Sequence, residues 1–174
     1  MYFQVGERVV YPNHGVGVIE SVTKADFTNG PQEFYHLRIQ SSNSLVMVPI
    51  ANAQNIGIRR IIRKDDIPLL FKMLSREFNE LDNDWKERFK DNCERMRTGD
   101  IFEVAEVVKN LVYLNHQKPL SFREKRLLDR ARQILVCEMA TVGHKKMPEV
   151  EALIEKALDS AYRRTVKKNG QLAS

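Results

Sequence analysis

The spacing of the apolar residues changes near residue 64, and this change divides the chain into two parts that fold differently. Before residue 64, apolar and polar residues alternate as in strands, whose successive side chains point to opposite faces. Turn-forming residues interrupt this alternation, and Asn29-Gly30-Pro31 is typical of a tight turn between two strands. The predicted strands lie at about residues 7–11, 15–24, 32–40, 44–49 and 56–60. Short antiparallel strands joined by tight turns predict a small barrel of SH3 or Tudor type.

After residue 64, apolar residues recur at helical spacing, and capping residues mark where helices begin and end. Asp65 and Asp66 can cap a first short helix, and Ser121 and Glu124 have the spacing of a capping box. Gly143 is typical of a helix end. The predicted helices span about residues 65–74, 84–97, 101–118, 121–142 and 148–168.

These two patterns predict an α+β protein of two domains, which a chain of 174 residues can accommodate. We expect a small β-domain over residues 1–64 and a compact all-helical domain over 65–170. A polar connector is expected at 75–83 inside the helical domain, and residues 171–174 are expected to be a tail.

The composition is that of a globular protein, with 43% hydrophobic and 29% charged residues. Its longest apolar runs, such as 45–50, are too short to span a bilayer, so no membrane contact is expected. The first residues lack a basic segment followed by an apolar stretch, so we expect no signal peptide. Because nothing points to export, Cys93 and Cys137 are expected to be reduced thiols in a cytoplasmic protein.

The net charge of +5 is compatible with a polyanionic partner but is a weak indication by itself. Residues 1–64 contain seven Lys or Arg and four Asp or Glu, whereas the rest of the chain is rich in both signs. Any nucleic-acid surface on the helical part must therefore be local.

Residue patterns for catalysis are not found. His14, His36, His116 and His144 are scattered and do not have metal-ligand spacing with each other or with the cysteines. The chain has no Gly-rich phosphate loop and no nucleophile or zinc-hydrolase motif. We therefore expect no enzymatic activity, no small-molecule substrate, no cofactor and no metal.

Trp85 is the only tryptophan, and it lies at the start of a predicted helix. One interpretation is a core anchor, because Trp85, Phe89, Asn92 and Met96 fall near one helix face. The other is an exposed wedge beside Lys86, where an aromatic ring presses against an opened base step and cations hold phosphates. The sequence pattern alone favours the core anchor.

A second group of basic residues, centred on Arg123, Lys125 and Arg126, opens the helix predicted at 121–142. The group has two interpretations that are about equally supported. It can be a solvated face with ion pairs along the helix, or a phosphate-binding surface at a helix N-terminus.

The strand predicted at 44–49 is strongly apolar and ends at Pro49, which lacks an N–H and suits an edge or a strand end. An ordinary core strand is the simpler interpretation. The alternative is an edge that accepts a partner strand.

Several motifs along residues 3–140 together resemble the CarD/CdnL family of bacterial transcription regulators. They are Phe3-x-Val5-Gly6-x-x-Val9-Val10-Tyr11-Pro12-x-His14-Gly15-Val16-Gly17, Val48-Pro49, Gly57-Ile58-Arg59, Trp85-x-x-Arg88-Phe89-Lys90, Gly99-Asp100, Val104-Ala105-Glu106-Val107-Val108 and Leu120-Ser121-x-x-Glu124-Lys125-Arg126-x-Leu128. The first motif is shared with the polymerase-binding module of transcription-repair coupling factors. Those are large helicases, and this chain carries no helicase motif, so the tryptophan-containing half makes the resemblance specific.

The resemblance implies a Tudor-like domain that docks on the β subunit of RNA polymerase by adding strand to strand. It also implies a helical domain that reaches the upstream edge of the promoter bubble, where a tryptophan wedged in the minor groove slows collapse of the open complex. The location implied is the bacterial cytoplasm, at the nucleoid through RNA polymerase. The DNA contacts that it implies are Trp85, Arg88, Lys90 and Lys125, and to these we add the neighbouring basic residues Lys86, Arg123 and Arg126. It implies that Met47 and Pro49 lie at the polymerase-facing edge, and we expect Leu37 and Val48 to contribute to the same polymerase-binding site.

Two positions depart from the family pattern. Glu87 stands beside Arg88, where relatives often have adjacent basic residues, and a carboxylate near phosphates lowers DNA affinity. Met47 stands where some relatives present an arginine to the polymerase, although strand pairing does not need that charge.

Two other functions stay open from the sequence. One is a Tudor-type reader of methylated cations, which needs an exposed aromatic cage built from Phe3, Tyr11, Phe34 and Tyr35. The alternation of these residues indicates that several point into the barrel instead. The other is a protein-interaction adaptor without DNA contact, in which Trp85 belongs to the core.

Overall fold

The computed structural model describes residues 2–81 and 84–172, with side chains up to residue 170. Five antiparallel strands form one sheet, and most of the helices follow them in the chain, as the sequence predicts. The strands are β1 (Arg8–Tyr11), β2 (Gly15–Phe27), β3 (Gly30–Ile39), β4 (Leu45–Pro49) and β5 (Arg59–Arg60). Their order across the sheet is β4-β3-β2-β1-β5, so β4 and β5 are the two edges.

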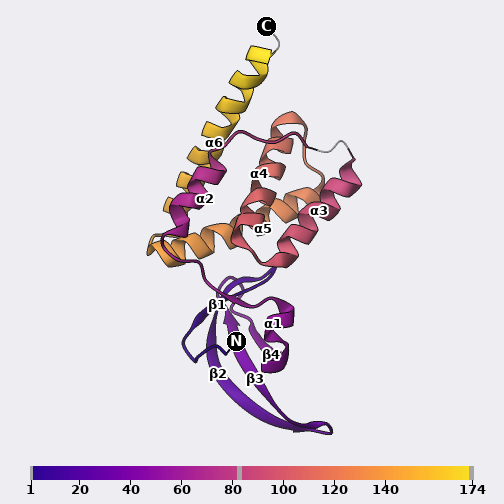
Figure 1. Ribbon diagram of the computed structural model, residues 1–174, viewed down its shortest axis with the longest axis vertical. Coiled ribbons are helices and arrows are strands. Elements are labelled where there is room, and N and C mark those ends of the chain that lie inside the picture. Colours follow the sequence, from indigo (N-terminus) through magenta and orange to yellow (C-terminus); the bar gives the residue numbers. More distant parts are fainter. Residues whose placement is uncertain (1, 82–83, 173–174) are drawn as a thin grey trace.

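The β2–β3 hairpin is longer than predicted and projects away from the helices as a curved arm (Figure 1). Its register runs from Gly17 opposite Ile39 to Phe27 opposite Gly30, with an irregularity between Ile19 and Ser21. Gly30 has φ 104°, which only glycine adopts without strain, so the turn predicted at this point is confirmed.

The strand predicted at 56–60 is mostly wrong. The 3-10 helix η1 (Ile50–Asn52) and the helix α1 (Ala53–Ile56) occupy most of the chain between β4 and β5. Gly57, with φ 87°, ends α1 in the left-handed conformation, and only Arg59 and Arg60 then pair with β1. A single turn of helix has too little periodicity to be recognised from the sequence.

Five longer helices make up the second part of the molecule. They are α2 (Asp66–Leu74), α3 (Trp85–Thr98), α4 (Ile101–Gln117), α5 (Phe122–Gly143) and α6 (Met147–Leu172). The capping box predicted for Ser121 and Glu124 is present at the start of α5. Helix α6 continues past the predicted end at 168 to include 171–172, and residues 173–174 of the predicted tail lie outside the described residues.

The described part of the predicted connector is anchored to the helices. Phe78 is buried, and its N–H donates to Oγ1 of Thr165 on α6 at 2.8 Å. The Lys109 ammonium of α4 donates to the carbonyls of Met73 and Arg76 at 2.9 and 3.1 Å, where α2 ends. Residues 82–83 of the predicted connector lie outside the described residues.

The sheet and the helices have separate cores that meet at α5. Val9, Ile19 and Leu37 belong to the core of the sheet, and the helical core gathers residues from α2 to α6. A small third cluster joins Val10 and Val16 of the sheet to Cys137 of α5. Figure 1 shows the sheet at one end of the molecule and α6 extending from the opposite end.

Cys93 and Cys137 are free thiols, as the sequence predicts, and burial raises the pKa of both. Within residues 2–81 and 84–172, no helix combines the length and the apolar composition needed to cross a membrane.

Candidate nucleic-acid interface

Trp85 lies in the first turn of α3 and is exposed over 55% of its surface. Asp84 caps the helix by accepting a hydrogen bond from the Lys86 N–H at 2.8 Å. The Lys86 ammonium lies 5.8 Å from the centre of the indole ring. Asn92 and Met96 of the same helix are buried, whereas Trp85 is largely exposed. The interpretation of Trp85 as a core anchor is therefore wrong.

Arg88 does not lie on this exposed surface. It is 7% exposed, and its Nη2 lies 3.6 Å from Oε1 of Glu124 on α5. Glu124 also accepts from the Ser121 N–H at 2.9 Å. Burial raises the pKa of Glu124, but hydrogen bonds with Ser121 and the charge of Arg88 outweigh this effect and lower the pKa overall. Arg88 therefore ties α3 to the N-terminus of α5 instead of facing solvent.

The other basic residues predicted to contact DNA are all exposed. None of them forms a salt bridge with a residue in the described part of the chain, so their charges are available to phosphates. They are Lys86 and Lys90 of α3 and Arg123, Lys125 and Arg126 of α5. Since α3 and α5 meet through Arg88 and Glu124, the chain brings two short basic segments together at adjacent helix starts.

Phe122 is a further exposed aromatic that the sequence motifs do not single out. It lies in the first turn of α5, is 73% exposed, and has the Arg126 guanidinium 5.7 Å from its ring centre. It lies two residues before the buried Glu124, which corresponds to the opposite side of the helix. That spacing is the signal that predicts its exposure.

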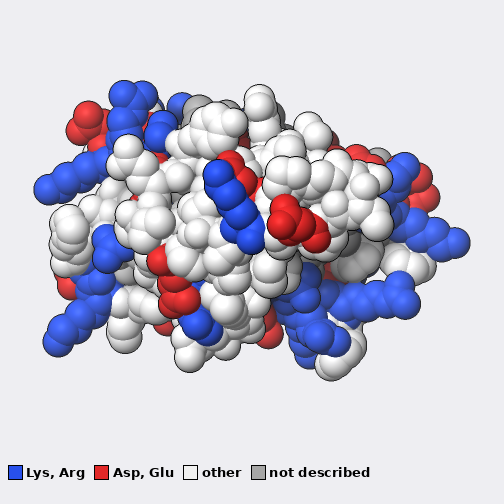
Figure 2. All heavy atoms as spheres, turned by 90° about the horizontal axis from the view of Figure 1, so that it is seen from below, with Lys and Arg blue, Asp and Glu red and all other residues white. Residues whose placement is uncertain are grey.

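Acidic and basic residues are mixed on the face of the molecule at the sheet end (Figure 2). Figure 2, which views the molecule from below, shows basic side chains around the edge with acidic side chains between them. The face in Figure 2 therefore does not present a continuous positive field.

The outer edge of β4 has no partner strand in the described part of the chain. The side chain of Met47 points outward and is 55% exposed, and Pro49 is half-buried. The side chains of Leu37 and Val48 are buried in the core of the sheet instead. The four residues predicted to contact polymerase therefore divide into an outward pair and a supporting pair.

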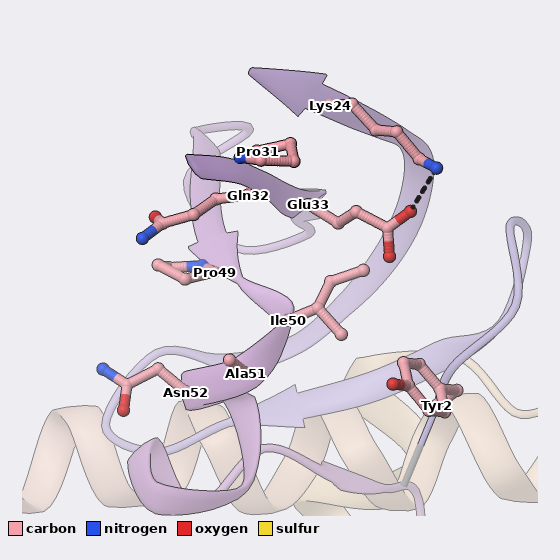
Figure 3. Close-up of a pocket in the computed structure, with 9 residues that line it drawn as sticks. All are labelled: Tyr2, Lys24, Pro31, Gln32, Glu33, Pro49, Ile50, Ala51 and Asn52. Carbon is pink, nitrogen blue, oxygen red and sulfur yellow. Dashed lines mark ion pairs between the residues drawn. The ribbon is translucent and has the colours of Figure 1, made fainter. Parts of the chain in front are cut away.

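A hollow of about 630 Å³ lies beyond the end of β4. Figure 3 shows Pro49 and Ile50 on one side of it and Lys24 and Glu33 of the β2–β3 hairpin on another. The Lys24 ammonium and the Glu33 carboxylate form an ion pair at 3.1 Å across the hairpin. The hollow therefore lies between the end of β4 and the β2–β3 hairpin.

The four aromatic residues considered for a methyl-cation cage do not form an open one. Phe3, Phe34 and Tyr35 are buried, and Tyr11 is half-buried. The Tyr35 hydroxyl accepts from the Phe3 N–H at 2.8 Å, which ties the N-terminal segment to the sheet. The structure gives no support to a methyl-cation reader. Within the described residues, no group of His, Cys, Asp and Glu could hold a metal ion.

Comparison with known proteins matches both parts of the chain. Residues 3–62 match the model of the CarD-like/TRCF RID domain, and residues 69–155 match the model of the CarD C-terminal domain. YdeB of Bacillus subtilis (strain 168), described as a candidate transcription factor, is 35% identical over 144 residues, covering 80% of this chain and 92% of YdeB.

A similar solved structure is the solution structure of the 72-residue N-terminal domain of Myxococcus xanthus CarD. It is 33% identical and covers 33% of this chain and 77% of that domain, with a TM-score of 0.29. The family assignment depends on the two domain models and on YdeB. The chain belongs to the CarD family of transcription regulators.

Proposed function

We propose that this regulator docks on the β subunit of bacterial RNA polymerase and stabilises the promoter open complex at the upstream edge of the bubble. Residues 1–64 are the polymerase-interacting domain and residues 65–170 the DNA-binding domain, which contains the connector 75–83 and is followed by the tail 171–174. The protein acts as a bridge without catalysis, in the cytoplasm and at the nucleoid.

The exposed Trp85 is the observation that carries the DNA half of this proposal. A large apolar ring on the surface of a helix end costs hydration free energy unless a partner covers it. Pressing the ring into the minor groove against a base step disturbs stacking, and this costs least where the duplex is already opening. Such a wedge responds to the deformability of DNA, so we expect little base-specific recognition.

Exposed cations near the starts of α3 and α5 hold the DNA backbone. Lys86 and Lys90 act from α3, and Arg123, Lys125 and Arg126 from α5. Arg88 has a supporting role, because its guanidinium is buried against Glu124. Glu87 is exposed beside Lys86, so we expect weaker phosphate binding on that side than on α5.

The outer edge of β4 supports the polymerase half. Within the described residues this edge is unpaired, so its backbone groups can extend the sheet by one strand from a partner, and the exposed Met47 and half-buried Pro49 lie on this edge strand. Leu37 and Val48 hold β4 in place from the core. The match of residues 3–62 to a domain shared with transcription-repair coupling factors points to the same partner.

Neither contact needs to be strong alone. Polymerase binding tethers the helical domain next to the promoter. It therefore raises the effective concentration of Trp85 at the fork, the upstream edge of the bubble where the duplex opens. A stabilisation of about 1.4 kcal/mol already changes the ratio of open to closed complexes about tenfold.

The test is the lifetime of competitor-resistant open complexes with cognate polymerase alone, with the wild-type protein, and with Trp85→Ala. We expect wild type to lengthen the lifetime and Trp85→Ala to lose most of this effect while staying folded. Leu69→Ala, which removes another exposed apolar side chain, is the matched control and should behave as wild type. No change with wild type on several promoters would leave a protein-interaction adaptor as the better hypothesis.

A further inference from the structure

The part of α6 after residue 155 carries a run of basic residues that lies beyond the segment matched by the family model, which ends at residue 155. Residues 156–170 contain five Lys or Arg and one acidic residue, Asp159. This part of the chain differs from the rest of the helical region, where the two signs are nearly balanced.

Three of these cations form a continuous stripe. Lys156, Arg163 and Lys167 follow each other at seven and four residues, which places them on one helix face and spreads them over about 16 Å. This face is opposite the one that packs on the bundle through Ile154, Leu158 and other buried residues of α6. The stripe is therefore presented to solvent along its whole length.

The charges of the stripe are not used inside the molecule. Lys156, Arg163 and Lys167 form no salt bridge with any residue in 2–81 or 84–170, whereas the neighbouring Lys168 is paired with Glu77 at 2.7 Å. The helix dipole does not account for them either, because it acts within the last turn, and α6 has no basic residue there.

The stripe lies within reach of DNA held at Trp85. Phe78 is hydrogen-bonded to Thr165 of α6, and Trp85 follows only seven positions after Phe78. A chain of seven residues spans at most about 25 Å, which corresponds to about seven base-pair steps of duplex. Figure 1 shows the start of α3 and the far end of α6 in the half of the molecule remote from the sheet.

We infer that the Lys156–Arg163–Lys167 stripe is a second DNA-binding surface, which holds the phosphate backbone of the duplex upstream of the fork. This inference rests on the proposed function for the position of the fork. The chemistry is charge neutralisation without base contacts, since the stripe contains only flexible cations on a convex helix face. Its role is to lengthen the DNA footprint and to fix the direction in which the upstream duplex leaves Trp85.

The test uses the full chain and forked DNA with upstream duplex arms of about 20 and about 5 base pairs, lengths chosen from the rise of 3.4 Å per base pair. Lys156→Gln/Arg163→Gln/Lys167→Gln is compared with wild type over a series of salt concentrations. Lys64→Gln/Lys72→Gln/Lys146→Gln removes the same charge from exposed lysines elsewhere and is the control. Far-ultraviolet circular dichroism checks that α6 stays helical in each variant.

With the long arm, we expect the stripe variant to bind more weakly than the control. The slope of its affinity against salt concentration, both on logarithmic scales, should fall by about 0.9 for each phosphate that the variant no longer neutralises. With the short arm, stripe variant and control should bind equally, because the stripe then has no duplex to hold. A stripe variant that matches the control on both arms overturns the inference.

Failure of this inference and failure of the proposed function give different results. If the stripe variant behaves as the control while Trp85→Ala still shortens open-complex lifetimes, the inference fails and the proposed function stands. If the stripe variant loses long-arm binding but wild type does not lengthen open-complex lifetimes, the stripe binds DNA and the proposed function fails.

Discussion

Arg59 of β5, at the edge of the sheet, and Glu138 of α5 form a bidentate ion pair that joins the sheet to the helices. Arg59 Nη1 and Nη2 donate to the Glu138 carboxylate at 2.7 and 3.0 Å, and Arg59 Nε donates to the Gly99 carbonyl at 2.8 Å. Glu138 is fully buried and also accepts from the Ile62 N–H at 3.0 Å. The pair fixes the orientation of the sheet relative to the helices, which the proposed bridging role requires.

Substituting Arg59 and substituting Glu138 should lower the unfolding free energy by unequal amounts. Arg59→Met leaves the Glu138 carboxylate buried with only the Ile62 N–H as donor, and we expect it to cost about 3–5 kcal/mol of unfolding free energy. Glu138→Met should cost less, because the Arg59 side chain is partly exposed and can be hydrated. The double variant should recover part of the loss, which urea denaturation of all four proteins measures. Equal losses in the two single variants would contradict this interpretation.

The β4 edge offers a pair of adjacent residues with opposite expectations. Met47→Asp changes an exposed side chain, so unfolding free energy should stay within about 0.5 kcal/mol of wild type while affinity for RNA polymerase falls. Val48→Ala removes buried methyl groups and should cost about 1–3 kcal/mol of stability with little effect on the affinity of the folded protein. Denaturation and direct binding to polymerase measure the two effects. If Met47→Asp binds polymerase as tightly as wild type does, the docking surface does not include this part of β4.

The features that the sequence predicts correctly depend on residues that are close together in the chain. The turn at Gly30 and the capping box of Ser121 and Glu124 depend on residues within three positions of each other, and both are present. The prediction that Arg88 faces DNA comes from the motif that it shares with Trp85. It misses the burial of Arg88 against Glu124, which is 36 positions away in sequence. The exposure of Trp85 likewise depends on where the core ends, which helical periodicity does not contain.

The exposed ring of Phe122 should contribute to DNA binding by stacking on a base near the fork. Base stacking on an aromatic side chain contributes about 1–3 kcal/mol, so Phe122→Ala should bind forked DNA at least several-fold more weakly. Because the ring is exposed, the unfolding free energy should change by no more than about 0.5 kcal/mol. Binding of Phe122→Ala and of the Leu69→Ala control to the same forked DNA tests this. Equal affinities for the two variants would exclude Phe122 from the DNA surface.

The contact between α3 and α5 should weaken in acid because of Glu124. Its pKa in the folded protein is below the ordinary value of 4.5: burial raises the pKa, but the hydrogen bonds with Ser121 and the charge of Arg88 outweigh it. As the pH falls below that value, the unfolded state takes up the proton first, so the unfolded state gains stability relative to the folded state. The stabilisation is therefore complete above the ordinary pKa and is lost as the pH falls through the lower folded pKa.

Glu124→Gln removes this titration and leaves the other carboxyl groups in place. The difference in unfolding free energy between wild type and Glu124→Gln should be constant near neutral pH and should shrink below about pH 4.5. Urea denaturation of both proteins at a series of pH values measures the difference, and the acid titration of the remaining groups cancels in it. A difference that stays constant down to about pH 3 would mean that the carboxylate of Glu124 is not what holds the start of α5 against Arg88.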